Sequence, residues 1–290
     1  MMPDLIIVGT DGSPAANAAA AWAVDDAARR GCPVRFVSVI DRWAYSAVKF
    51  PTGAGDPLTQ QAERALAEAE AIARKRRPDV EVSLEIAEGL PARILREKAD
   101  EASAVVVGGT GVGGFAGAVL GSVASHVAGH APGPVVVVRP GWEKAAEREE
   151  IVLGVDGSPE CEPAMAYAFG EARLRGARIR AVYAWRLPIL PLVPEIGYDP
   201  EEAREAEHRI LSSALEPWRN RYPDVEVTEE AVLAHPVDAL TAAAAGAALL
   251  VVGSHGRGAL GSLVLGSVSR AVLHHAYCPV AVVRPRPSSG

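Results

Sequence analysis

The chain repeats itself at an interval of 145 residues, which is half of its length of 290. A glycine pattern with the spacing Gly-x2-Gly-x9-Gly-Ser occurs at Gly108, Gly111, Gly121 and Ser122, and again at Gly253, Gly256, Gly266 and Ser267. The turn Asp-Gly-Ser-Pro at 11–14 and 156–159 keeps the same interval. A duplication of this kind predicts two similar domains of about 140 residues, each large enough to bury its own core.

We expect the first domain at residues 1–140, the second at 150–290 and a linker at 141–149. Alternating strands and helices are typical of an α/β fold with a parallel, doubly wound sheet. The sequence thus predicts two tandem five-stranded sheets with helices on both faces. In the first copy, strands are expected at 4–9, 34–40, 80–86, 104–109 and 135–138, and helices at 14–30, 57–77, 91–101 and 121–130; the second copy repeats this order from 151 to 283.

The last strand of each copy, 135–138 or 280–283, is strongly apolar and lies at the edge of its sheet. An uncovered apolar edge invites aggregation. We therefore expect these two strands to pair antiparallel within the chain, making a pseudo-dimer of the two domains. A homodimer of the whole chain is left open.

A ligand site is expected in each domain where the first and fourth strands end, if the strand order is 3-2-1-4-5. Ligands of doubly wound sheets bind beyond the carboxyl ends of the strands, where the order reverses. In the first domain these strands end at Asp11 and at the loop after Gly108. Glycines let the backbone approach a ligand, and the helix start at Gly121 presents unpaired N–H groups to an anion. A carboxylate facing such a cradle suits a nucleoside phosphate.

The charge balance makes general nucleic-acid or anionic-membrane binding unexpected, because the net charge is −7. A basic run at 74–77 ends a predicted helix, where cations are favoured in any case. The uncharged stretch 102–138 has the length of a membrane span, but its glycines and prolines divide it into strand, loop, helix and strand. No membrane contact is therefore predicted.

The three cysteines, Cys32, Cys161 and Cys278, occupy unrelated places in the two copies. A scattered, odd count fits reduced thiols, which we expect to be packing residues. The first residues lack the positive region of a secretory signal. A cytoplasmic location is therefore expected.

Other motifs of the chain could indicate a different kind of site. The string G-x-G-x-x-G occurs at 109–114 and 256–261, but it follows the fourth strand and differs in offset between the copies, so an NAD site is not favoured. No G-x-x-x-x-G-K-[ST] motif is present, so a P-loop with its lysine is not predicted. His274 and His275 point in different directions on a helix, which favours a structural role over metal binding.

Plainer roles also stay open for the candidate ligand residues. Asp11 and Asp156 suit turns and caps, and Ser122 and Ser267 suit helix N-caps. His255 lies in the second glycine loop, where ligand contact and simple exposure are equally compatible with the sequence.

The motifs resemble the universal stress protein family in its tandem two-domain form. Both Gly-x2-Gly-x9-Gly-Ser elements, the VGTDGSP and LGVDGSP turns and the PVVVVRP and PVAVVRP strands carry this resemblance, which covers nearly the whole chain except the linker. It implies the strand order 3-2-1-4-5 and the binding of ATP, with Mg²⁺ left open. The adenine and ribose would lie at Asp11 and Asp156, the base against the backbone at Val39 and Ala184, and the phosphates on the Gly-Ser elements.

The expected ligand-binding residues follow from the cradle and the resemblance together. They are Gly9, Thr10, Asp11, Val39, Gly108, Gly111, Gly121, Ser122 and Val123 in the first domain, and Val155, Asp156, Ala184, Gly253, His255, Gly256, Arg257, Gly266, Ser267, Val268 and Ser269 in the second. Because only the second loop carries Arg257, His255 and Ser269, we expect the second domain to bind more tightly. No catalytic or metal-binding residue is predicted.

The leading hypothesis is a binding protein that regulates a stress or growth response through nucleotide occupancy. Two alternatives stay open. One is a slow ATPase or nucleotidyl-transfer enzyme on the same fold, and the other is an adaptor whose pockets are empty.

Overall fold

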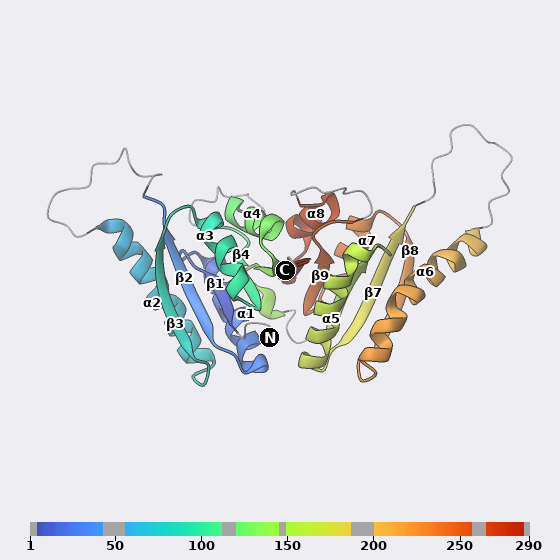
Figure 1. The fold of residues 1–290 in the computed structure, drawn as a ribbon, viewed down its shortest axis with the longest axis horizontal. Coiled ribbons are helices and arrows are strands. Elements are labelled where there is room, and N and C mark those ends of the chain that lie inside the picture. Colours follow the sequence, from blue (N-terminus) through green and yellow to red (C-terminus); the bar gives the residue numbers. More distant parts are fainter. Residues whose placement is uncertain are drawn as a thin grey trace, which may run out of the picture.

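A computed structural model describes residues 5–42, 56–111, 120–144, 149–186, 200–256 and 265–286 of the chain. Two similar halves share one continuous ten-stranded sheet of order β3-β2-β1-β4-β5-β10-β9-β6-β7-β8 (Figure 1). Within each half the order is 3-2-1-4-5 and all neighbouring strands are parallel, as predicted. The strands are β1 (Ile6–Gly9), β2 (Val34–Ile40), β3 (Val82–Glu88), β4 (Ala104–Gly108), β5 (Gly133–Val138), β6 (Glu150–Val155), β7 (Arg178–Trp185), β8 (Val227–Leu233), β9 (Leu249–Gly253) and β10 (Val280–Arg284).

The two halves join through β5 and β10, which pair antiparallel. This confirms the predicted pairing of the two apolar edge strands. Val136 and Ala281, which are equivalent positions of the repeat, lie opposite each other in the register. A pseudo-twofold axis therefore passes between these two residues, and the pairing leaves β3 and β8 as the outer strands of the sheet.

Helices cover both faces of the sheet, as predicted. One core cluster contains buried side chains from α1, α2, α5 and α6, and a second contains side chains from α3, α4, α7 and α8. Figure 1 shows α1 and α5 on one side of the central sheet and α4 and α8 on the other. The helices are α1 (Pro14–Arg30), α2 (Pro57–Arg76), α3 (Pro91–Lys98), α4 (Ser122–His130), α5 (Glu162–Arg175), α6 (Pro200–Arg221), α7 (Pro236–Ala243) and α8 (Ser267–His275).

Helix α1 shows why the alanine-rich stretch folds as it does. The Ser13 side chain accepts a hydrogen bond from the Ala16 N–H, Pro14 occupies the first turn, and Gly31 ends the helix in the left-handed region at φ 65°. Most of its alanines are buried, because β4, α2 and α5 all pack against it. Small side chains let these elements approach closely.

Several predicted boundaries shift for local reasons. Strand β3 begins at Val82 rather than at 80, because the Val80 N–H is used in a turn to the Arg77 carbonyl. The helix expected at 91–101 ends at Lys98 and continues as a 3₁₀ turn, Ala99–Glu101. In the second half a 3₁₀ turn, Pro159–Cys161, precedes α5. The long loops after the second strand of each copy fall largely at 43–55 and 187–199, outside the described residues.

The segment predicted as the linker begins with a turn that packs against the first half. A 3₁₀ turn covers Trp142–Lys144, and the Trp142 side chain is buried in the core cluster that includes α1 and α2. The Arg76 guanidinium carbon lies 5.3 Å from the centre of its ring. The sequence did not predict this contact, because Trp142 stands among charged residues and belongs to no periodic hydrophobic pattern.

Reciprocal ion pairs join α1 to α5 beside the pseudo-twofold axis. Asp26 and Glu171 are equivalent, as are Arg30 and Arg175, and each carboxylate contacts both guanidinium groups. Asp26 is fully buried and Glu171 nearly so. Each guanidinium also lies against an aromatic ring of the other half, with Arg175 5.3 Å from the Trp22 ring centre.

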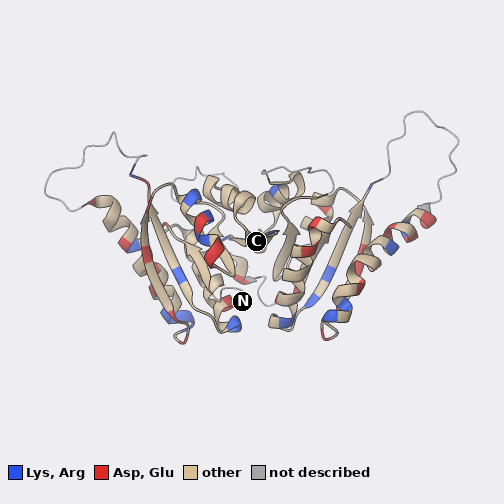
Figure 2. Ribbon diagram, in the orientation of Figure 1, with Lys and Arg blue, Asp and Glu red and all other residues tan. Residues whose placement is uncertain are grey.

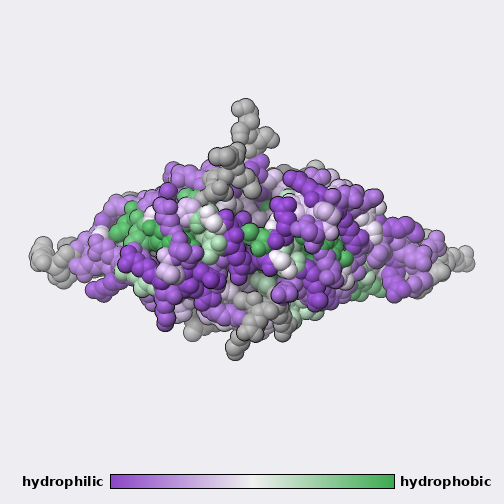
Figure 3. Space-filling view, turned by 90° about the horizontal axis from the view of Figure 1, so that it is seen from below, coloured by the Kyte–Doolittle hydropathy of each residue, from purple (hydrophilic) through white to green (hydrophobic). Residues whose placement is uncertain are grey.

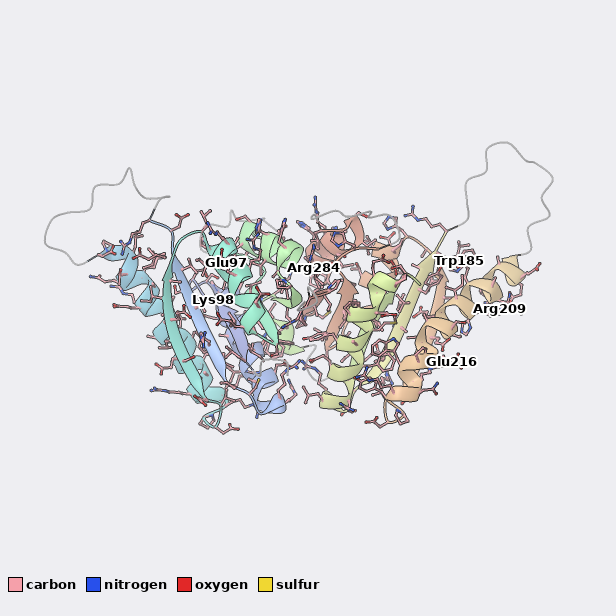
Figure 4. The ribbon with its side chains drawn as sticks, viewed as in Figure 1. Glu97, Lys98, Trp185, Arg209, Glu216 and Arg284 are labelled. Atoms are coloured by element: carbon pink, nitrogen blue, oxygen red, sulfur yellow. The ribbon has the colours of Figure 1, made fainter. Side chains whose placement is uncertain are left out.

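Two further arginines tie the halves together on the opposite face. Arg139 donates to the carbonyls of Leu273 and His274 at the end of α8, at 2.5 and 3.0 Å. Its equivalent, Arg284, donates to the Gly129 carbonyl near the end of α4 and lies between the two halves in Figure 4. A cation at a helix C-terminus satisfies unpaired carbonyls and opposes the helix dipole.

The outer surface is predominantly polar. Figure 2 shows acidic and basic residues interspersed along α2 and α6 and few on α4 and α8. Seen from below, hydrophilic residues cover most of the face, with a hydrophobic area in each half (Figure 3). The basic run at the end of α2 is partly neutralised, since Arg74 pairs with Glu70, and Arg76 and Arg77 pair with Asp25. Among the helices described, none combines the length and apolarity needed to span a membrane.

Candidate functional site

Each half contains a cavity at the carboxyl ends of its strands, bounded on one side by the glycine-rich loop. The cavities measure about 440 and 450 Å³, within the usual range for small-molecule sites. The first is lined by Gly9, Thr10, Asp11, Ala16, Val37, Val39, Pro91, Leu95, Val107, Gly108, Thr110, Gly111, Leu120, Gly121, Ser122, Val123 and Ala124. The second is lined by Gly154, Val155, Asp156, Cys161, Val182, Tyr183, Ala184, Pro236, Leu240, Val252, Gly253, His255, Gly256, Gly266, Ser267, Val268 and Ser269.

The structure gathers the predicted ligand residues around these two cavities. Every one predicted in the first domain lines the first cavity. Every one predicted in the second domain lines the second cavity, except Arg257, which falls outside the described residues. Their placement at one edge of each sheet follows from the parallel strands, whose carboxyl ends meet there.

The two glycine motifs face the two aspartates directly. A Cβ atom built on Gly111 would lie 2.6 Å from Oδ2 of Asp11, and one built on Gly256 would lie 2.6 Å from Oδ2 of Asp156. The loop backbone can therefore pass this close to the carboxylate only at a residue without a side chain. The second glycine of each motif thus shapes the gap between carboxylate and loop.

The aspartates also serve the turn role that the sequence left open. Oδ1 of Asp11 accepts a hydrogen bond from the Ser13 N–H at 3.0 Å, and Oδ1 of Asp156 accepts one from the Ser158 N–H at 2.9 Å. In the second half the Ser158 hydroxyl donates to the same oxygen and does not cap a helix. One carboxylate oxygen therefore fixes the turn while the other lies toward the loop.

The helix starts at the cavities are capped by glycine. Gly121 and Gly266 are the N-cap residues of α4 and α8, and neither makes a side-chain cap bond. The alternative that Ser122 and Ser267 are N-caps is therefore wrong, because both are the first residues of their helices. Their position at a helix start leaves hydroxyl and N–H groups beside the cavity.

The glycine-rich loop has the same length in both halves and is closed in the same way. The Gly121 N–H donates to the Gly109 carbonyl at 2.6 Å, and the Gly266 N–H donates to the Ser254 carbonyl at 2.9 Å. These bonds bring the two ends of each glycine-rich loop together. The middle of each loop, 112–119 or 257–264, lies outside the described part of the chain.

Gly108 has a second reason to be glycine. A Cβ there would lie 2.6–2.8 Å from backbone atoms of Ala15 and Ala16, in the first turn of α1. The end of β4 and the start of α1 therefore pack backbone against backbone. This glycine lines the cavity and also sets how closely α1 approaches the sheet.

Two residues predicted to contact the ligand in the second cavity, Ser269 and His255, also make hydrogen bonds within the protein. The Ser269 hydroxyl donates to the Gly253 carbonyl at 2.6 Å, so its proton is used within the protein. His255 Nδ1 lies 3.0 Å from the Ser254 hydroxyl oxygen, while its buried Nε2 has no hydrogen-bond partner among the described residues. His255 is therefore held by one ring nitrogen beside the cavity.

Sequence reasoning missed the apolar walls of both cavities. Val37 and Leu95 contribute to the first, and Val182 and Leu240 to the second. These side chains belong to the core cluster containing α3 and α7, so their pattern in the sequence is that of ordinary core residues. The prolines that begin α3 and α7, which keep the 145-residue interval, were the available signal.

Cys161 also lines the second cavity, where the first has Ala16. Burial raises the pKa of its thiol to about 12. It is therefore neutral at physiological pH and packs as a small apolar side chain. All three cysteines are free and buried, which confirms the prediction that they are packing residues.

The described residues contain no group of three or more His, Cys, Asp or Glu side chains that could hold a metal ion. His274 and His275 occupy the last turn of α8. Burial first, and then the nearby positive charge of Arg139, lowers the pKa of His274. This favours its neutral form at the contact between the halves.

Comparison with known proteins places these features in context. A sequence model described as "Universal stress protein family" matches residues 2–139 and 147–284, two segments offset by the same 145 residues. A universal stress protein of Mycobacterium tuberculosis is 36% identical over 288 residues, covering 96% of each chain. One from Mycolicibacterium smegmatis is 36% identical over 291 residues, covering 97% of each.

A solved structure supports the fold independently. The crystal structure of a universal stress protein from Archaeoglobus fulgidus matches with a TM-score of 0.71 at 18% identity, covering 99% of this chain and 100% of that one. At this identity the likeness concerns the fold. The tandem arrangement of two α/β units therefore has an experimentally determined counterpart.

Proposed function

The chain belongs to the universal stress protein family, and from that premise we propose that each of its two cavities binds an adenine nucleotide, with ATP as the ligand. The observation that carries the proposal is the facing of Asp11 and Gly111, repeated at Asp156 and Gly256. It leaves a backbone cradle that a Cβ would fill, next to a carboxylate and a helix start. These three groups suit a sugar hydroxyl and an anionic phosphate.

Each part of the nucleotide has a matching wall. Phosphates would lie on the N–H groups of Ser122 and Ser267, at the starts of α4 and α8, where the helix dipole favours negative charge. The ribose would contact Oδ2 of Asp11 or Asp156, the carboxylate oxygen that faces the loop. The base would occupy the apolar side, against residues such as Val37 and Leu95 in the first cavity.

The function proposed for this binding is regulatory. ATP occupancy in one or both domains would control a stress or growth response in the cytoplasm. We expect retention of ATP rather than its turnover. Incubation of the pure protein with labelled ATP distinguishes the two, since release of labelled phosphate at a steady rate would favour the slow ATPase. Measuring the ATP affinity with and without EDTA shows whether Mg²⁺ accompanies the nucleotide.

Aspartate substitutions at the helix starts test the binding assignment. Gly121→Asp places a carboxylate where the first phosphate site is proposed, and Gly266→Asp does so in the second. Each single variant should lose binding at one site. In the double variant the ATP affinity should fall about 100-fold or more, because like charges repel in a partly buried site. Titration calorimetry measures this, with circular dichroism as the check on folding. A folded double variant with unchanged ATP affinity would rule the sites out.

A further inference from the structure

The two cavities differ at a position that the glycine motifs do not include. Thr10 follows β1 in the first half, and Val155 is its equivalent in the second. Both residues line their cavities, and both side chains are 5% exposed. Threonine and valine have nearly the same shape, so the main difference is one hydroxyl group in place of one methyl group.

The Thr10 hydroxyl is buried, and Oγ1 has no hydrogen-bond partner among the described residues. A buried hydroxyl without a partner destabilises a folded protein, whereas a valine of the same shape does not. The second half shows that this fold accepts valine at the position. The threonine is therefore poorly explained by the needs of the fold alone.

The place of Thr10 in the cavity indicates which part of a ligand it would meet. Its backbone N–H donates to the Val37 carbonyl at 2.9 Å, which fixes it at the junction of β1 and β2. Val37 and Val39 of β2 line the same cavity, and β2 lies on the opposite side of β1 from β4, the strand that the glycine-rich loop follows. Rotation about the Cα–Cβ bond moves the hydroxyl from one staggered position to another, so a ligand in the cavity can draw the hydroxyl toward itself.

We propose that Thr10 hydrogen-bonds the nucleoside part of the nucleotide in the first cavity, and that the two cavities therefore differ in how they recognise the nucleoside. The inference rests on the proposed nucleotide binding. In the second cavity the equivalent side chain, Val155, offers only apolar contact. The first cavity would thus bind the nucleoside through the Thr10 hydroxyl, a contact that the second cavity lacks.

The test combines binding and stability measurements on Thr10→Val, made in the Gly266→Asp background so that only the first site binds. ATP and adenosine are titrated separately. We expect Thr10→Val to weaken both by the same factor of about three- to tenfold, because the lost contact involves no phosphate. Thr10→Ser, which keeps the hydroxyl, should restore most of the affinity. The melting temperature of the nucleotide-free protein should be unchanged or higher in Thr10→Val.

Thr241→Val is the matched control. Thr241 lies in α7, its buried hydroxyl also has no partner among the described residues, and it lines neither cavity. This variant should keep the first-site affinity. The reciprocal change Val155→Thr, made in the Gly121→Asp background, should tighten adenosine binding to the second site.

Three outcomes would overturn the inference while leaving the proposed function intact. They are an ATP affinity of Thr10→Val within twofold of its parent, a loss confined to ATP and absent for adenosine, and a lower melting temperature in Thr10→Val without nucleotide. The last would show that the hydroxyl serves the fold. If the parent protein binds neither ATP nor adenosine, the proposed function itself fails.

Discussion

The two cavities share a backbone and differ in their side chains. Both have the aspartate facing the second glycine, the glycine N-cap and the loop closed by an N–H to carbonyl bond. They differ where a side chain would touch the ligand, as at Thr10 and Val155 or at Thr110 and His255. The cradle is therefore a property of the repeated backbone, and we expect the strength and selectivity of the proposed binding to depend on a few substituted positions.

The contact between the halves is the region most sensitive to disruption. Asp26→Asn would remove one charge from the buried cluster and leave Arg30 and Arg175 short of a partner. We expect a loss of about 3–5 kcal/mol in the free energy of unfolding, and a similar loss for its equivalent Glu171→Gln. Urea unfolding at neutral pH measures both.

Asp25→Asn provides the control for this prediction. Asp25 pairs with Arg76 and Arg77, whose side chains are more exposed, and its equivalent in the second half is Gly170. Its substitution should cost only about 1 kcal/mol. If Asp26→Asn were as mild as Asp25→Asn, the reciprocal cluster would not hold the halves together.

Much of this architecture could be predicted from the sequence, but this cluster could not. The buried strands β4 and β9 are continuous apolar runs, and the repeat interval located the equivalents of each motif. Asp26 and Arg30 gave no such signal, because on a helix they look like an ordinary surface pair four residues apart. Their burial depends on α5, which lies far away in the sequence.

The candidate site was predictable to a similar degree. The placement of the glycines and aspartates around the cavities could be predicted, because a close backbone approach requires particular residue types at fixed spacing. The apolar walls could not, since Leu95 and Leu240 resemble other core residues. The engagement of the Ser269 hydroxyl with a backbone carbonyl was also invisible, because it depends on where α8 meets β9.

Gly111→Ala and Gly256→Ala test whether the cradle is the same in both halves. A methyl group at either position would displace the facing carboxylate. That carboxylate is held in place because its Oδ1 accepts a hydrogen bond from the turn. We expect ATP affinity to fall about tenfold at each site, and by the same factor at both. Calorimetry in the single-site backgrounds measures the two values.

Gly170→Ala serves as the control for these alanine variants. A Cβ at Gly170, within α5, meets no atom within 4 Å. This variant should bind ATP normally and gain stability, since alanine favours the helix. Markedly unequal losses at Gly111 and Gly256 would show that the two cradles do not act alike.

A smaller effect is expected at Arg257, which lies outside the described residues and matches Val112 in the first half. An added guanidinium should make the second site bind ATP about three- to tenfold more tightly, and less so as salt rises, because an exposed charge is screened. Arg257→Val should remove this advantage. Equal affinities at the two sites, with Arg257→Val silent, would contradict the prediction.

The smallest effect concerns histidines on α4 and α8. Burial first, and then the neighbouring positive charges, lowers the pKa of His126 and of His274 in the folded protein. Stability from these groups is complete above their unfolded pKa of about 6.5 and declines as pH falls through that region toward the lower folded value. The melting temperature of the double variant His126→Asn, His274→Asn should therefore fall less between pH 7.5 and 5 than that of the parent. An identical pH dependence would count against both shifts.

The number of nucleotides bound per chain is the sharpest test of the proposed nucleotide binding. Equilibrium dialysis of the full chain against labelled ATP counts the bound molecules, and the ultraviolet spectrum and mass of the ligand released on denaturation identify it. We predict two bound ATP molecules per chain in the parent protein, one in Gly121→Asp or Gly266→Asp, and none in the double variant. A folded parent protein that binds no adenine nucleotide at either cavity would contradict it.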